Sequence, residues 1–213
     1  MSAAPSPLTP DEFDRLADVS RETSAKLRLH AALLLQWRGR VNLIGDSTFS
    51  DLWRRHFLDS AQLHALIPRD AATLVDIGSG AGFPGLVLAA MGGLDVHLVE
   101  SDGRKCVFLR EVVAAASLTA TIHNKRVEEF NSLRADVVTA RAVAPLSRLL
   151  DYSSKLLAPG GSFLFHKGRA VEDELTDAAK RWKMDVERFP SQTDPSGTIL
   201  RLTGVRKRNA ERR

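Results

Sequence analysis

A run of glycines between two carboxylates is the part of this sequence whose spacing points most directly to chemistry. Asp76 ends a short apolar run, and the next nine residues hold three glycines at alternate positions and a fourth that closes the turn. Glycine admits positive φ and lets a ligand come close to the backbone. Glu100 ends the following apolar run, where a carboxylate can accept hydrogen bonds from ribose hydroxyls. The pattern predicts a loop that binds a nucleotide-containing cofactor.

Two classes of cofactor compete for this loop. Residues 80–85 match the dinucleotide pattern G-x-G-x-x-G, which on its own favours a nicotinamide-dependent oxidoreductase. Asp76, however, lies two residues before the first glycine, where a carboxylate would repel a pyrophosphate. The same carboxylate suits a cationic ligand, such as the sulfonium and ammonium groups of S-adenosylmethionine. The spacing therefore favours S-adenosylmethionine and keeps the oxidoreductase as the alternative.

Strands and helices alternate from residue 73 onwards, as in a doubly wound α/β fold. Asp102 can cap the helix after the second strand, and a turn signal at 194–197 joins the last two strands. Two strands joined by a short turn form a hairpin, so the last strand is predicted to be antiparallel in an otherwise parallel sheet. Such a Rossmann-like sheet resembles that of the class I S-adenosylmethionine-dependent methyltransferases. The predicted strands are 73–77, 95–99, 120–123, 135–139, 162–166, 184–189 and 198–205, with helices at 84–91, 145–157 and 169–182.

A helical segment precedes the alternating region. Residues 9–12, Thr-Pro-Asp-Glu, form a capping box with proline in the first turn, and they predict a helix that runs to about Val19. Further helices are expected over 21–37 and 51–66. We therefore divide the chain into a disordered tail (1–8), an N-terminal helical extension packed on the core (9–70), a methyltransferase domain (71–206) and a basic C-terminal tail (207–213).

The chain of 213 residues carries a net charge of +4, and its C-terminal end is the most basic part. Residues 201–213 hold six basic side chains and one acid, so the rest of the chain is close to neutral. The basic end suggests phosphate contacts, although a solvated terminus would look the same. A single cysteine, Cys106, excludes an internal disulfide and a cysteine-based metal cluster, and we expect no metal. With no apolar run of about 20 residues and no signal peptide, we expect a cytoplasmic protein that does not bind a membrane.

The residues after the fourth predicted strand narrow the class of methyl acceptor. An exocyclic amine methyltransferase usually carries an Asn/Asp-Pro-Pro-aromatic turn there, whereas residues 139–145 read Thr-Ala-Arg-Ala-Val-Ala-Pro. The Lys-Asp-Lys-Glu tetrad typical of ribose methyltransferases is missing, and Cys106, the only possible nucleophile for cytosine methylation, lies in a predicted core helix. What remains is an acceptor with a free lone pair, such as guanine N7, which needs positioning but no general base.

Seven short motifs cover most of residues 35–170. They are residues 41–43, 55–60, 74–85, 104–109, 126–130, 139–142 and 166–168. In their order and together, these motifs resemble the bacterial small-subunit ribosomal RNA methyltransferase G family, also called glucose-inhibited division protein B. The resemblance implies a methyltransferase that modifies N7 of one guanine, position 527, in 16S ribosomal RNA. It implies that the partner is 16S ribosomal RNA or the small-subunit ribosomal particle. We expect the protein to be a monomer.

The resemblance also implies roles for individual residues. Cofactor contacts are expected from Gly78, Phe83, Val127, Glu128 and Arg141, in addition to Asp76, Gly80 and Glu100 from the loop pattern. No catalytic residue is assigned beyond Arg141, which could orient the cofactor or guanine O6. The expected RNA contacts are Arg55, Lys167, Arg206, Lys207 and Arg208, each of which could equally be a solvated surface charge. A non-catalytic RNA-binding protein on the same fold is the second alternative.

Overall fold

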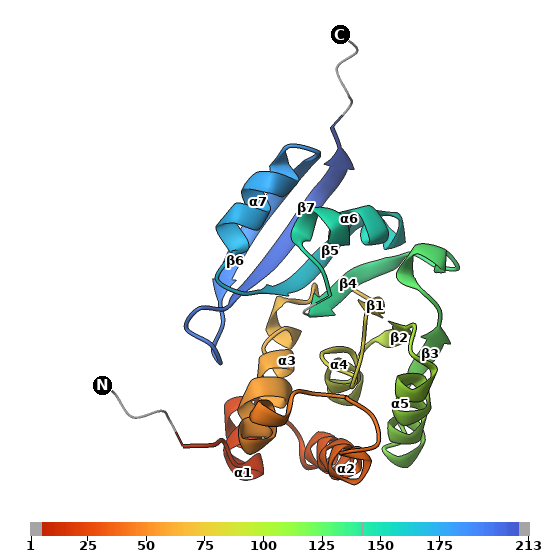
Figure 1. Ribbon diagram of the computed structural model, residues 1–213, viewed down its shortest axis with the longest axis vertical. Coiled ribbons are helices and arrows are strands. Elements are labelled where there is room, and N and C mark those ends of the chain that lie inside the picture. Colours follow the sequence, from red (N-terminus) through yellow and green to blue (C-terminus); the bar gives the residue numbers. More distant parts are fainter. Residues whose placement is uncertain (1–5, 142, 209–213) are drawn as a thin grey trace.

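The computed structural model describes residues 6–141 and 143–208. Its strands are β1 (Thr73–Ile77), β2 (Asp95–Glu100), β3 (Ala120–Asn124), β4 (Ala135–Arg141), β5 (Leu157–Lys167), β6 (Trp182–Pro190) and β7 (Thr198–Lys207). They form one sheet in the order β3-β2-β1-β4-β5-β7-β6 (Figure 1). The first five strands are parallel, and β7 is antiparallel to both of its neighbours. The predicted sheet, mostly parallel with an antiparallel last strand, is confirmed.

Helices cover both faces of the sheet. Those that follow the strands are α4 (Gly85–Met91), α5 (Gly103–Ala115), α6 (Leu146–Ser153) and α7 (Val171–Ala179). Figure 1 shows α4 and α5 on one side of the sheet, and α6 and α7 on the other. Successive side chains of a strand point to opposite faces. Leu74 of β1 therefore joins the core of α4 and α5, whereas its neighbour Val75 joins the core of α6 and α7.

The N-terminal extension packs on the face that α4 and α5 cover. Its helices are α1 (Pro10–Leu16), α2 (Arg21–Trp37) and the short α3 (Asp59–Ala61). The capping box predicted for the first helix is present: the Thr9 hydroxyl accepts the Glu12 N–H at 3.3 Å, and the Glu12 carboxylate accepts the Thr9 N–H at 2.8 Å. Phe57 of the extension and Leu86 of α4 belong to one apolar core. The extension thus packs against α4.

The continuous helix predicted over 51–66 is wrong, because the chain there forms four short segments. A 3-10 turn (Asp46–Asp51) and a π-helical turn (Trp53–Leu58) precede α3, and a second 3-10 turn (His64–Leu66) follows it. At the end of the π turn the Asp59 N–H donates to the Arg54 carbonyl, five residues back. The Arg55 carbonyl, which an α-helix would use, accepts from Arg141 of β4 at 3.0 Å instead. A tertiary contact therefore accompanies the change of helix type.

The ends of the described chain differ from the predicted tails. Leu8, which we expected in the disordered tail, is buried, and its N–H donates to the Asp51 carboxylate at 2.8 Å. β7 runs to Lys207, one residue into the predicted basic tail. Residues 1–5 and 209–213 lie outside the described part of the chain. None of the helices described has the combined length and apolarity that crossing a membrane requires.

Candidate active site

A cavity of about 290 Å³ lies at the carboxyl ends of the first strands, where a doubly wound sheet binds its ligands. We call it the cofactor crevice. It brings together four predicted cofactor residues from three separate parts of the sequence, namely Gly78, Glu100, Val127 and Glu128. The other four, which are Asp76, Gly80, Phe83 and Arg141, do not line it.

Glu100 supplies the cofactor crevice with a mostly buried carboxylate. Its Oε2 accepts the Gly80 N–H at 2.9 Å, and its Oε1 accepts the Asp102 N–H at 2.8 Å. Each oxygen keeps a further lone pair, so ribose hydroxyls can still donate to it. Gly78 has a φ of 66°, and a Cβ there would lie 2.7 Å from the side chain of Val143. The crevice therefore combines an acceptor with a position that only glycine fits without strain.

Asp76 lies beneath the glycine loop and has no solvent exposure. Its Oδ1 accepts the Thr139 hydroxyl at 2.8 Å, and its Oδ2 accepts the Gly85 N–H at 3.3 Å. Burial raises the pKa of this carboxyl to about 6. The geometry makes Asp76 a positioning residue that joins the start of α4 to β4. A direct contact with a cationic cofactor stays a prediction.

Phe83 lies in an aromatic cluster between the loop and the extension. Its ring is 4.9 Å from that of His30, in a stacked arrangement, and 5.0 Å from that of His56. The His30 Nε2 donates to the Ala81 carbonyl at 2.8 Å, which fixes the loop from α2. Burial lowers the pKa of His30 to about 4, so this imidazole is neutral at physiological pH. Phe83 therefore supports the loop from below instead of lining the cofactor crevice.

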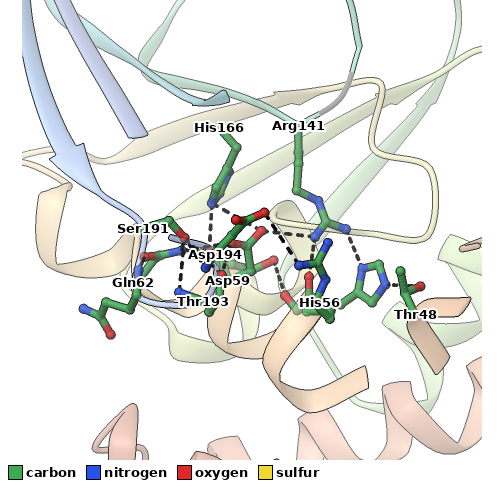
Figure 2. Close-up of polar contacts among 12 residues, drawn as sticks. Thr48, His56, Asp59, Gln62, Arg141, His166, Ser191, Thr193 and Asp194 are labelled. Atoms are coloured by element: carbon green, nitrogen blue, oxygen red, sulfur yellow. Dashed lines mark hydrogen bonds and ion pairs between the residues drawn. The ribbon is translucent and has the colours of Figure 1, made fainter. Parts of the chain in front are cut away.

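Arg141, at the end of β4, points toward the extension (Figure 2). Its guanidinium donates to the Arg55 carbonyl at 3.0 Å, to Oδ2 of Asp59 at 3.3 Å and to Nδ1 of His56 at 2.8 Å. His56 can accept only when it is neutral, and burial together with the Arg141 charge lowers its pKa to about 3. The proton then lies on Nε2, which donates to the Thr48 hydroxyl at 2.8 Å.

Asp59 joins four parts of the fold (Figure 2). Besides Arg141 of β4, it binds Thr193 of the β6–β7 turn, whose hydroxyl donates to Oδ1 at 2.6 Å. The Gln62 amide donates to the same oxygen at 3.0 Å. His166 of β5 donates from Nε2 to the Asp59 carbonyl at 2.8 Å. The sequence did not indicate this role for Asp59, and only its place in the motif 55–60 could have drawn attention to it.

A second cavity of about 210 Å³ lies beside this network, at the carboxyl ends of β4 and β5. We call it the strand-end pocket. Its lining residues are Asp59, Arg141, His166, Lys167, Gly168, Ser191, Asp194, Gly197 and Thr198. The chain after β4 separates the two cavities, because Val143 and Ala144 line the cofactor crevice. The strand order of the sheet reverses between β1 and β4, and one cavity lies on each side of this point.

Lys167 and Arg55, two of the predicted RNA contacts, make ion pairs within the protein. The Lys167 ammonium is buried and donates to Glu174 at 2.7 Å and to the Ala144 carbonyl at 2.8 Å. A phosphate contact by Lys167 stays a prediction, and it would require this pair to open. Arg55 is half exposed and lies 3.6 Å from Asp194. It can therefore reach a phosphate at the surface more readily.

The predicted basic tail begins at the opposite end of the strands from the two cavities. β7 is antiparallel to β5, so its end at Lys207 lies away from the carboxyl ends of the parallel strands (Figure 1). Arg208 donates to the Ala179 carbonyl at 2.7 Å, and the Lys207 ammonium is 3.7 Å from Asp151, while Arg206 is exposed. RNA contacts by these three residues stay a prediction, and they would be made far from the two cavities.

Comparison with known proteins identifies the family. The model of the GidB family, described as rRNA small subunit methyltransferase G, matches residues 23–198. The chain belongs to this family. The ribosomal RNA small subunit methyltransferase G of Paramagnetospirillum magneticum is 56% identical over 202 residues, which cover 95% of this chain and 98% of that protein. The protein of the same name from Rhodospirillum centenum is 52% identical over 200 residues, covering 94% of this chain and 93% of that protein.

Solved structures support the fold. A ribosomal protein L11 methylase from Lactobacillus delbrueckii subsp. bulgaricus has a TM-score of 0.58 at 13% identity, with 68% of this chain and 76% of that chain covered. M. jannaschii TYW2 in complex with AdoMet has a TM-score of 0.54 at 16% identity, with 68% and 73% covered. The predicted class I methyltransferase fold is confirmed, and so is the predicted family of ribosomal RNA methyltransferases.

Proposed function

We propose that this enzyme uses S-adenosylmethionine to methylate N7 of one guanine in 16S ribosomal RNA, at position 527. The reaction class, the cofactor and the ribosomal RNA substrate follow from membership of the small-subunit ribosomal RNA methyltransferase G family. The choice of N7 and of a single position is the finer part of the proposal. The observation that supports it best is the pair of cavities on the two sides of the chain after β4.

The cofactor crevice fits S-adenosylmethionine. When bound, this cofactor supplies a methyl group on a positively charged sulfur. Glu100 offers carboxylate lone pairs to ribose hydroxyls, and Gly78, where a Cβ would lie 2.7 Å from Val143, brings bare backbone to the crevice. Val127 and Glu128, in a 3-10 turn after β3, line the crevice with one apolar and one polar side chain. Such a lining suits an adenosine, which has an apolar face and polar edges.

The basic and acidic side chains near the strand-end pocket are hydrogen-bonded to one another, so they hold the site in place and are not free to act as a general base. His56 accepts from Arg141, His166 donates to the Asp59 carbonyl, and burial lowers the pKa of both imidazoles. Asp59 is tied to Arg141 and Thr193. Guanine N7 carries a lone pair and no proton, so its methylation needs alignment but no general base. An acceptor of this kind matches the residues present.

We also infer that the enzyme acts as a monomer in the cytoplasm, where ribosomal subunits are assembled. Ribosomal RNA as substrate supports the location. Sedimentation of the purified protein tests the oligomeric state, and a stable dimer at micromolar concentration would contradict the monomer.

Incubation of small-subunit ribosomal particles that lack the modification with the purified enzyme and labelled S-adenosylmethionine tests the function. We expect one labelled 7-methylguanosine per particle after digestion to nucleosides. Parallel calorimetry with S-adenosylmethionine and NAD distinguishes the alternatives. Tight NAD binding without S-adenosylmethionine binding would indicate an oxidoreductase, and cofactor and RNA binding without methyl transfer would indicate a non-catalytic protein.

A further inference from the structure

The strand-end pocket has a wall whose polar groups match one face of a nucleobase. We propose that this pocket binds the acceptor guanine, and that Arg141 and Asp59 select guanine over adenine by recognising the edge that carries O6 and N1. The inference rests on the proposed methylation of guanine N7. It gives Arg141 a partner in the RNA and gives Asp59 a specificity-determining role.

The location of the pocket places its occupant beside the cofactor crevice. Arg141 lines the strand-end pocket, and two residues later Val143 lines the cofactor crevice. Lys167, in the wall of the pocket, also holds the carbonyl of Ala144, which lines the crevice, at 2.8 Å. A base in the strand-end pocket would therefore lie next to the cofactor crevice, where N7 must meet the methyl group.

The wall of the pocket presents a donor next to an acceptor. Nη1 of Arg141 uses both of its N–H groups, on the Arg55 carbonyl and on Oδ2 of Asp59 at 3.3 Å, whereas the N–H of Nε and one N–H of Nη2 have no partner among the described residues and are left for O6. Among the described residues this 3.3 Å contact is the one hydrogen bond that Oδ2 accepts, whereas Oδ1 accepts two. A carboxylate oxygen has two lone pairs, so Oδ2 can accept a further bond.

Guanine fits this donor–acceptor pair and adenine does not. Guanine presents an acceptor, O6, next to a donor, N1–H, so O6 would face Arg141 and N1–H would face Asp59. Adenine presents a donor at N6 next to an acceptor at N1, which is the reverse order. With adenine in the pocket the two N–H groups would face each other, and the N1 lone pair would face a carboxylate. Both mismatches would leave buried polar groups unpaired.

The same arrangement leaves N7 free for methylation. An arginine commonly binds guanine through O6 and N7 together, which would occupy the lone pair that must attack the methyl group. When Arg141 binds O6 and Asp59 binds N1–H, N7 lies on the far side of O6 and carries no hydrogen bond. The pairing of Arg141 with Asp59 therefore selects guanine and also leaves its N7 free to react with the methyl group.

His166 positions Asp59 in this wall. It is mostly buried and lines the pocket, and its Nε2 donates to the Asp59 carbonyl. The other ring nitrogen, Nδ1, is buried away from the cavity and has no hydrogen-bond partner among the described residues. The recognition of guanine therefore rests on Arg141 and Asp59.

The test compares guanine with adenine at the acceptor position. Reconstituted small-subunit particles carry 16S ribosomal RNA with either base, and binding is measured with S-adenosylhomocysteine present so that no transfer occurs. We expect the wild-type enzyme to bind the guanine particle about tenfold more tightly. In Asp59→Asn the side-chain amide can donate to adenine N1, so the preference should fall to about twofold or less.

Asp194→Asn is the matched control, because Asp194 is the other carboxylate of the pocket. Its Oδ1 accepts the Ser196 N–H and hydroxyl, both at 2.8 Å, and its Oδ2 faces Arg55. This variant should keep the tenfold preference. Any effect of the base change on the RNA itself cancels, since all three proteins meet the same two particles. An unchanged preference in Asp59→Asn, or an equal loss in Asp194→Asn, would overturn the assignment to Asp59.

A measurement on the wild-type enzyme covers the case in which Asp59→Asn fails to fold, as shown by lost binding of S-adenosylhomocysteine. N1-methylguanine at the acceptor position removes the N1–H donor and leaves O6 and N7 in place. We expect particles with this base to bind about tenfold more weakly, and equal binding would refute the inference. If the wild-type enzyme fails to methylate guanine particles at all, the proposed function fails instead, so the two failures are distinguishable.

Discussion

Arg141 is the residue whose environment differs most from what its place in the sequence suggests. The family motif favoured a cofactor contact, yet the guanidinium donates to three acceptors of the extension and lines the strand-end pocket. One of these acceptors is His56, which burial keeps neutral. Each partner of Arg141 is more than 80 residues away in the chain, so residue type and spacing could not reveal the contacts.

Arg141→Lys separates the two roles of this residue. A lysine keeps the charge but cannot reproduce the planar set of five donors, so it cannot bind the three partners and O6 together. We expect single-turnover methyl transfer to fall more than tenfold, while calorimetry shows an S-adenosylmethionine affinity within about twofold of wild type. A parallel loss of cofactor affinity would assign Arg141 to the cofactor crevice, and normal transfer would remove it from the site.

Glu100→Gln tests the cofactor crevice. Glu100 now accepts hydrogen bonds from the backbone N–H groups of Gly80 and Asp102. The substitution removes the charge and turns an NH₂ group toward one of these two donors. We expect S-adenosylmethionine binding to weaken by about 1–3 kcal/mol in calorimetry. Glu187→Gln, which changes an acid paired with Arg201 near the far edge of the sheet, is the control and should bind the cofactor normally. Equal affinities in all three proteins would contradict the ribose contact.

At the scale of elements, the start of α4 depends on a glycine. A Cβ at Gly85 would lie 2.8 Å from both Cβ and Oδ2 of the buried Asp76. Gly85→Ala should therefore displace Asp76, lower the free energy of unfolding by about 1–3 kcal/mol and weaken cofactor binding. Gly103→Ala, at the start of α5, is the matched control, because its Cβ would meet only Asn124 at 3.5 Å. Denaturant unfolding that finds the two variants equally stable would contradict this account of the loop.

The contact between α2 and the loop makes stability depend on pH. His30 is neutral in the folded protein, with a pKa lowered to about 4, whereas in the unfolded chain its pKa is about 6.5. The unfolded chain therefore binds more protons below pH 6.5, and stability falls as the pH drops from 6.5 toward 4. From pH 7 to pH 5 the wild type should lose about 2 kcal/mol more than His30→Gln, which keeps a donor for Ala81.

Denaturant unfolding at the two pH values measures this difference. The raised pKa of Asp76 acts in the opposite direction, because the folded protein binds the extra proton between about pH 4 and pH 6. Asp76 is present in both proteins, so its effect cancels in the comparison. An identical pH dependence of the wild type and His30→Gln would show that His30 does not titrate as its burial implies.

The elements that local pattern determines were predicted well. β1 has its predicted bounds and α2 runs over the predicted residues, since apolar periodicity and flanking signals define them. The interrupted segment from 46 to 66 was not predicted, because its π turn is accompanied by a hydrogen bond from Arg141, 86 residues away, to the Arg55 carbonyl. β5 begins five residues before its prediction, at Leu157, where an apolar pair adjoins a Pro-Gly-Gly turn signal that argued against a strand.

At the scale of the whole molecule, the site is assembled from parts that are distant in the sequence. The glycine loop and Glu100 could be identified from local spacing, because they adjoin the ends of two predicted strands. The strand-end pocket could not, since it needs the π turn of the extension, the ends of β4 and β5, and the β6–β7 turn to meet at Asp59. Its residues are ordinary in type, and only tertiary structure brings them together.

Methylation of N7 of one guanine in 16S ribosomal RNA leaves a mark that can be read in the cell. Mass mapping of that RNA from a strain without the gene, and from the same strain with the gene restored, tests it most directly. We expect a single fragment, containing position 527, to lose one methyl group on deletion and to regain it on restoration, with chain cleavage specific for 7-methylguanine at that base. A methyl group that persists at this guanine after deletion, or that returns on another base or atom, would contradict the proposed activity.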